Sequence, residues 1–95
     1  MPTVFILLTT EIGAEKHVLD SLRKINEVQE AHTLWGVYNI IANIKAENME
    51  DLKQVITKRI GKIGKVNSKL TMLIEDQKTP AISEQVIFEN NPILV

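Results

Sequence analysis

Cysteine is absent from this chain of 95 residues, which excludes disulfide bonds and thiolate catalysis and disfavours a structural zinc site. Neither sign of charge dominates, because the net charge is −1 and Lys and Arg are spread through the sequence. A typical nucleic-acid binder would show a basic face. The N-terminal apolar run, residues 4–8, is too short for a signal peptide or a membrane span. We therefore expect a soluble cytoplasmic protein that contacts neither nucleic acid nor a membrane directly.

The composition is that of an ordinary globular protein, 44% hydrophobic and 24% charged. This length allows one domain with a modest core, so association between copies is an expected source of further burial. We assign residues 1–76 to the domain and residues 77–95 to a C-terminal tail. The tail carries apolar segments at residues 85–88 and 93–95, and is expected to dock on its own or a neighbouring subunit.

Hydrophobic periodicity predicts the element order strand, helix, strand, strand, helix, strand. The strands are expected at residues 3–9, 28–35, 40–46 and 66–75. The first helix presents an apolar stripe made of Ala14, Val18, Leu22 and Ile25. Asn48 is the expected N-cap of the second helix, whose apolar face consists of Leu52, Val55, Ile56 and Ile60.

A weak internal repeat supports this order. Sliding the chain by 38 residues places Lys24, Ile25, Val28 and Thr33 on Lys62, Ile63, Val66 and Thr71, all identities. Each half is then a strand–helix–strand unit. Two such units interleaved predict an α+β, ferredoxin-like βαββαβ fold, in which a four-stranded antiparallel sheet carries two helices on one face.

The helices can cover only one face of that sheet. In the two outer strands the even positions are the expected core residues: Leu34, Leu70, Met72 and Ile74. The odd positions are then expected on the other face: Ala31, Thr33, Trp35, Lys69, Thr71 and Leu73. Together with Phe5, Leu7 and Ile41, this open face is more apolar than monomers usually leave exposed. We expect a homodimer packed sheet to sheet.

Signals for catalysis are weak. His17 and His32 are the candidate general bases, but a solvated or structural histidine explains each more simply. Neither shows metal-ligand spacing with a second histidine, and the sequence contains no phosphate-binding loop and no nucleophile elbow. We predict a protein that is not an enzyme, with no metal and no cofactor.

The central segment, residues 33–41, holds the only Trp and the only Tyr of the chain, Trp35 and Tyr38. Gly36 and Asn39 tolerate the backbone conformations of a tight turn, so the segment is predicted to be a hairpin. Large aromatic side chains beside a turn are costly to leave in water. We expect these two side chains to be covered by the protein's own core, by a second subunit or by a ligand.

Three segments, residues 22–31, 36–39 and 66–71, resemble the effector-binding (RAM-type) domain of the Lrp/AsnC transcriptional regulators. The resemblance covers about residues 3–75. It implies a βαββαβ domain that dimerises through its sheets, assembles further into rings, and binds amino acids or related small molecules where dimers meet. The full regulators of that family carry an N-terminal helix-turn-helix, so this chain is expected to be a stand-alone member.

The resemblance also implies a ligand site. Carried over by position, its residues are Thr33, Trp35, Gly36, Tyr38, Asn39, Lys69 and Thr71, with the last two contributed by an adjacent subunit. Asn39 stands where the family usually has Asp, and Lys69 where Thr is common. Asn39 therefore lacks the carboxylate that would suit a ligand ammonium, and Lys69 adds a cation. These differences favour an anionic metabolite, or no ligand, over a free α-amino acid.

The sequence leaves three alternative functions open. The preferred one is a small-molecule-sensing and oligomerisation module that acts in transcriptional regulation without its own DNA-binding domain, through assembly with a full-length regulator. The second is a ligand-free structural module whose hairpin aromatics are buried between dimers. The third is an enzyme of the dimeric α+β barrel type, which would need His17 or His32 beside a cavity.

Overall fold

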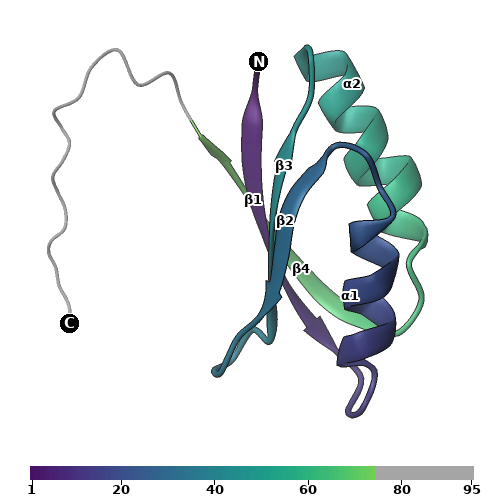
Figure 1. The fold of residues 1–95 in the computed structure, drawn as a ribbon. Coiled ribbons are helices and arrows are strands. Elements are labelled where there is room, and N and C mark those ends of the chain that lie inside the picture. Colours follow the sequence, from purple (N-terminus) through teal and green to yellow (C-terminus); the bar gives the residue numbers. More distant parts are fainter. Residues whose placement is uncertain (75–95) are drawn as a thin grey trace, which may run out of the picture.

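The computed structural model describes residues 1–74 (Figure 1). Along the chain the elements are β1 (Thr3–Thr10), α1 (Glu15–Arg23), β2 (Val28–Thr33), β3 (Ile40–Lys45), α2 (Met49–Gln54) and β4 (Val66–Ile74). After Gln54 the second helix continues through a π-helical segment, Val55–Arg59, and a 3-10 turn, Ile60–Lys62. The predicted βαββαβ order is confirmed. The predicted tail, residues 77–95, lies outside the described residues.

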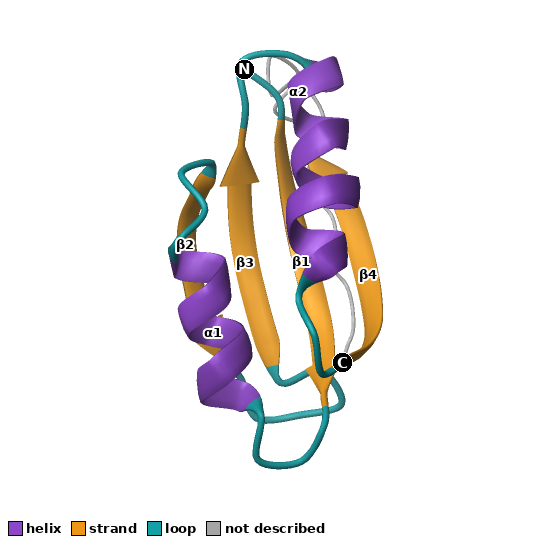
Figure 2. Ribbon diagram, turned by 90° about the vertical axis from the view of Figure 1, so that its right-hand side faces the viewer, coloured by secondary structure: helices purple, strands orange, loops and turns teal. Residues whose placement is uncertain are grey.

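The four strands form one antiparallel sheet in the order β2-β3-β1-β4. The strands β1 and β3 are therefore central, and β2 and β4 form the two edges. Both helices lie on the same face of the sheet, with α1 in front of β2 and α2 on the side of β1 and β4 (Figure 2). This is the ferredoxin-like arrangement that the periodicity and the internal repeat predict.

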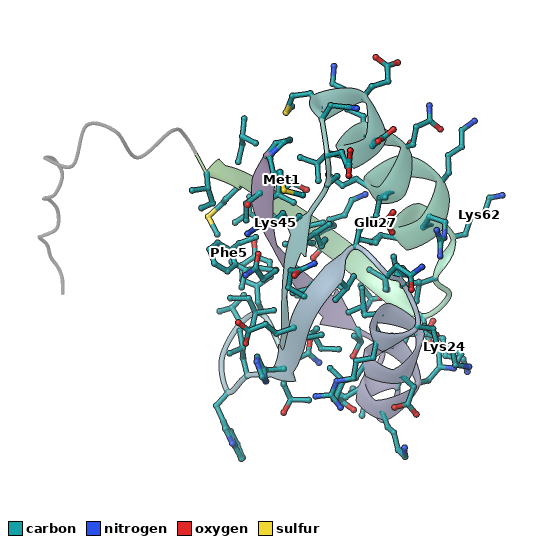
Figure 3. All side chains as sticks on the ribbon, turned by 45° about the horizontal axis from the view of Figure 1, so that its top comes forward. Met1, Phe5, Lys24, Glu27, Lys45 and Lys62 are labelled. Carbon is teal, nitrogen blue, oxygen red and sulfur yellow. The ribbon has the colours of Figure 1, made fainter. Side chains whose placement is uncertain are left out.

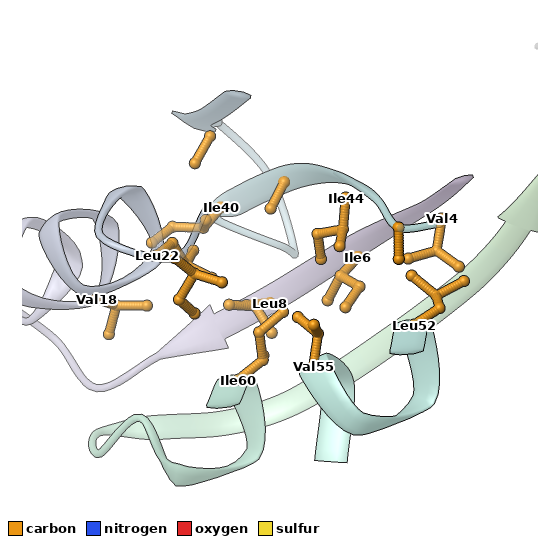
Figure 4. Packing of buried hydrophobic residues seen from close by; sticks show 14 residues of the cluster. Val4, Ile6, Leu8, Val18, Leu22, Ile40, Ile44, Leu52, Val55 and Ile60 are labelled. Atoms are coloured by element: carbon orange, nitrogen blue, oxygen red, sulfur yellow. The ribbon is translucent and has the colours of Figure 1, made fainter. Parts of the chain in front are cut away.

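The core lies between the sheet and the helices (Figure 4). Burial alternates along β1 and β3, as expected for strands with one covered face. The strands contribute Val4, Ile6, Leu8, Ile40, Ala42 and Ile44, and the helical segments contribute Val18, Leu22, Leu52, Val55 and Ile60. Asn48 caps the second helix as predicted, because its Oδ1 accepts a hydrogen bond of 2.8 Å from the backbone N–H of Asp51.

The predicted faces of both outer strands are wrong. In β2, Ala31 is predicted on the open face, but it pairs with the buried Ala42 and is itself 1% exposed. Paired residues of an antiparallel sheet share a face, and Lys69, Thr71 and Leu73 pair with the buried Leu8, Ile6 and Val4. These three residues therefore lie on the helix side. Leu70 and Met72, predicted core residues, lie on the open face and are each 41% exposed, and Leu34 is 37% exposed.

For β4 the reason is its position at the sheet edge. Leu73 is 48% exposed although it faces the helix side, so the helical layer covers that edge only in part. The more apolar face of this strand is the open one. Ranking the two faces of an edge strand by hydrophobicity therefore selected the wrong side.

The open face carries an apolar group made of Phe5, Leu7, Ile41, Leu70 and Met72. Phe5 pairs with Met72, and Leu7 pairs with both Ile41 and Leu70, so the group crosses three adjacent strands. Figure 3 shows Phe5 projecting from the sheet on the side away from the helices. Within residues 1–74, no helix is long and apolar enough to cross a bilayer.

Candidate functional site

The loop between β2 and β3 is the most exposed aromatic part of the described chain. The strand β2 ends at Thr33, two residues earlier than predicted, so Trp35 belongs to the loop. The backbone N–H of Leu34 donates to the carbonyl of Asn39 across the loop at 2.8 Å. Gly36 has a φ of 149°, which side-chain-bearing residues rarely adopt. Trp35 is 104% exposed, so nothing within residues 1–74 covers it.

Asn39 fixes this loop to two other elements. Its Oδ1 accepts the backbone N–H of Thr10 at 3.1 Å, and its Nδ2 donates to Thr10 Oγ1 at 2.9 Å and to Glu15 Oε2 at 3.3 Å. The backbone N–H of Asn39 donates to the carbonyl of Leu8 at 3.0 Å. The side-chain amide uses both of its protons and one oxygen lone pair on the protein itself. Asn39 thus joins the loop to the end of β1 and the start of α1.

A hollow of about 370 Å³ opens beside the loop. It is lined by Glu15, Thr33, Leu34, Trp35, Gly36 and Asn39. Pockets for small organic ligands usually measure about 300–1,000 Å³, so the hollow is large enough for an amino acid. Four of the seven predicted site residues meet here, because β2, the loop and the start of β3 place them at one end of the sheet.

The sequence prediction missed two lining residues, Leu34, which adjoins Trp35 in the chain, and Glu15. Glu15 precedes Asn39 by 24 positions and belongs to a different element, so no local motif connects the two. A topological signal existed nonetheless. In a βαββαβ fold the junction of β1 with α1 and the hairpin between β2 and β3 lie at the same end of the sheet, which places the first turn of α1 beside the hairpin.

The other predicted site residues lie elsewhere in the single chain. Tyr38 is half-buried at the base of the loop and does not line the hollow. Lys69 lines a second hollow, of about 350 Å³, between β4 and the end of the second helix. Thr71 lies further along β4 and is exposed. Since β2 and β4 are opposite edges of the sheet, Lys69 and Thr71 can reach the loop only from another copy.

The histidines do not form a catalytic arrangement. His32 faces the open side, where its Nε2 lies 2.9 Å from Glu30 Oε1 with both side chains largely exposed. The hollow that it lines measures about 70 Å³, which is small for a substrate pocket. His17 is an exposed residue of α1. In the described part of the chain no three His, Asp or Glu side chains gather as a metal site would require.

Comparison with known proteins identifies the family. The model of the Lrp/AsnC ligand binding domain matches residues 3–80. The chain belongs to this family. No curated protein sequence matches it. Family members are transcriptional regulators and not enzymes, which is the class predicted from the sequence.

Two solved structures match this Lrp/AsnC domain over nearly their whole length. FFRP-DM1 is 35% identical with a TM-score of 0.76, covering 79% of this chain and 100% of that one. The hypothetical protein PHS023 from Pyrococcus horikoshii is 33% identical with a TM-score of 0.75, covering 83% of this chain and 98% of that one. AsnC of E. coli is 21% identical with a TM-score of 0.73, and the match covers 90% of this chain but 56% of AsnC. That last likeness shows the shared fold.

Asn39→Asp is expected to lower the free energy of unfolding of this Lrp/AsnC domain by about 1–3 kcal/mol. An ionised carboxylate cannot donate to Thr10 Oγ1 or to Glu15, and it would lie beside the Glu15 carboxylate. Urea denaturation followed by circular dichroism measures the change. Asn67→Asp, the same substitution at an exposed position of β4, is the control and is expected to stay within about 0.5 kcal/mol of the wild type. Equal stability of the two variants would contradict a clamping role for Asn39.

Proposed function

We propose that this Lrp/AsnC domain is a small-molecule sensor that assembles with further copies of itself and acts in transcriptional regulation. The observation that carries the proposal is the hollow at the β2–β3 loop, which combines a ligand-sized volume with a fully exposed Trp35. An exposed indole beside a concave polar surface is well suited to cover the apolar part of a ligand. Contact with DNA would come through assembly with a full-length regulator of the same family.

The proposed ligand is an amino acid or a related metabolite. A regulator of the same fold, NMB0573 of Neisseria meningitidis, was solved as a complex with L-Met. That protein is 15% identical to this chain, with a TM-score of 0.71. The proposal for this chain therefore depends on its own hollow, where Thr33, Gly36 and Asn39 supply polar groups and Trp35 supplies an apolar wall.

The proposed assembly uses two surfaces. The apolar group on the open face supports a homodimer packed sheet to sheet, because monomeric proteins rarely leave such a patch in water. The exposed loop and the exposed edge strand β4 support contacts between dimers. Such contacts would bring Lys69 and Thr71 of one copy to Thr33 and Trp35 of another, which would complete the predicted ligand site apart from Tyr38.

A ligand-free contact between dimers is the second candidate, and the same exposure of Trp35 favours it. A buried aromatic anchor stabilises a protein interface whether or not a ligand is present. The two candidates differ in what they require. Sensing needs a metabolite that stabilises the protein, whereas a structural contact needs only the indole.

Binding of the twenty L-amino acids and a set of organic acids to the intact protein tests the function. A ligand at about 100 times its dissociation constant adds about 2.7 kcal/mol to the stability, so a true effector is expected to raise the melting temperature by several degrees. Trp35 is the only Trp, so its fluorescence reports binding at the hollow directly. If no compound changes either signal while Trp35→Ala reduces the oligomer size in native mass spectrometry, the structural candidate is correct.

A further inference from the structure

The hollow at the β2–β3 loop contains one carboxylate, and it comes from the helix. Glu15 begins α1 and is half-buried against the loop. Its Oε2 accepts the 3.3 Å hydrogen bond from Asn39 Nδ2, which aims the group at the loop. Among residues 1–74, no Lys, Arg or His forms an ion pair with Glu15. Within a single copy, the described residues therefore give the negative charge in the hollow no ion-pair partner.

Asn39 holds the Glu15 carboxylate in place and does not itself compete for the ligand. The amide donates to Glu15 and to Thr10 Oγ1 and accepts from the Thr10 backbone, so its own groups are already engaged. The amide is neutral, and it leaves the charge of the hollow to Glu15. A carboxylate at position 39 would lie against that of Glu15, and like charges at hydrogen-bond distance repel each other. One carboxylate and one amide thus form a unit with a single negative charge.

We propose that Glu15 is a specificity-determining residue that binds the ammonium group of the ligand, with Asn39 as its positioning residue. This inference rests on the proposed function and narrows the ligand to primary amines with an apolar part, of which α-amino acids are the nearest class. A carboxylate that accepts a hydrogen bond from an ammonium forms a strong, charge-assisted interaction. The indole of Trp35 lines the same hollow and favours both an apolar group and a nearby cation.

The position of Glu15 changes the ligand expected from the sequence. Asn39 in place of Asp removes a carboxylate from the hairpin, which by itself favours an anionic ligand or none. In space the carboxylate is present, because Glu15 lies within hydrogen-bond distance of the Asn39 side chain. The charge that an ammonium requires is supplied by α1 instead of by the hairpin.

The test compares each amino acid that has a primary amine, which excludes proline, with its 2-hydroxy acid, which keeps the carboxylate and the side chain but lacks the ammonium. Binding to the full chain is measured by Trp35 fluorescence and by calorimetry. We expect at least one amino acid to bind the wild type and its 2-hydroxy acid to bind at least about tenfold more weakly. Glu15→Gln is expected to weaken the amino acid about tenfold or more and to leave the 2-hydroxy acid unchanged. Glu11→Gln removes an exposed carboxylate outside the hollow and is expected to bind as the wild type does.

A double variant separates this role from a structural one. Combining Glu15→Gln with Asn39→Asp exchanges the carboxylate and the amide and keeps one of each, so the donor and the acceptor of the hydrogen bond change places. We expect the double variant to recover most of the amino-acid affinity that Glu15→Gln loses, and to be more stable than Asn39→Asp alone. Thermal unfolding without ligand verifies that each variant folds.

The outcomes distinguish the inference from the function. If amino acids bind Glu15→Gln as tightly as the wild type, or if 2-hydroxy acids bind the wild type equally well, the role of Glu15 is wrong while sensing stands. If the double variant folds but binds the amino acid as weakly as Glu15→Gln does, Glu15 and Asn39 do not act together as proposed. If no compound of either series binds the wild type, the proposed function fails together with the inference.

Discussion

Replacing Ile6 with alanine is expected to lower the free energy of unfolding by about 2–5 kcal/mol. Ile6 is 0% exposed at the centre of β1, paired with Ala42 on one side and Thr71 on the other, beneath the helical layer. Neighbouring strands hold its backbone in place, so the sheet cannot collapse into the space that the lost side chain leaves. A domain of this size is stable by about 5–15 kcal/mol in total, so the loss is a large fraction. Urea denaturation at fixed protein concentration measures it.

Ile12→Ala is the matched control. The same atoms are removed, but Ile12 is 103% exposed in the turn after β1. Surface substitutions away from special features usually change stability by less than about 0.5 kcal/mol. A similar loss in both variants would mean that Ile6 is not the centre of the core, and would contradict the placement of the helices over this face of the sheet.

Leu70→Glu is expected to convert the assembled protein into monomers. Leu70 lies on the open face beside Leu7, in the middle of the apolar group that we propose packs against a second copy. A carboxylate buried there without a partner costs several kcal/mol, which weakens dimerisation by a factor of about one hundred or more. Since Leu70 is 41% exposed on an edge strand, the monomer itself is expected to fold. Native mass spectrometry and light scattering report the mass.

Leu73→Glu provides a control on the same strand. Leu73 is similarly exposed, at 48%, but its pairing with Val4 places it on the helix side. This variant is expected to keep the sheet-to-sheet dimer. Any loss of mass is expected only at the contact between dimers, because Leu73 shares its side of β4 with Lys69 and Thr71. The opposite result, with Leu73→Glu monomeric and Leu70→Glu assembled, would support the faces predicted from the sequence and contradict the register of β4 described above.

The central part of the fold could be predicted because its residues obey simple periods. Val4, Ile6 and Leu8 alternate in a strand that is covered on one face, and Val18 and Leu22 repeat at helical spacing. The edge strand β4 does not follow these patterns. Its hydrophobic face depends on what packs against the open side, which the residues of β4 do not show. Its pairing with β1 is also interrupted by a bulge, because Thr9 and Thr10 pair with Ser68 and Val66, which leaves one extra residue in β4.

The residues of the candidate site that are close together in the sequence could be predicted. Thr33, Trp35, Gly36 and Asn39 lie within one loop and the ends of its strands, so a single motif contains them all. Glu15 could not be found in that way, because its place in the hollow depends on how α1 returns along the sheet. The role of Asn39 also changed. A residue expected to differ from its family in what it offers a ligand instead uses its amide to orient a neighbouring carboxylate.

The strand order has a consequence for how such a sensor would respond in a cell. The strands β2 and β4 are opposite edges of one sheet, so a ligand that touches both Thr33 and Thr71 joins two copies. Binding is then linked to association by mass action, and the apparent affinity for the metabolite rises with the concentration of the protein. The abundance of the chain would set the metabolite level at which it responds. A cell could therefore retune the threshold through expression alone, without changing a residue of the site.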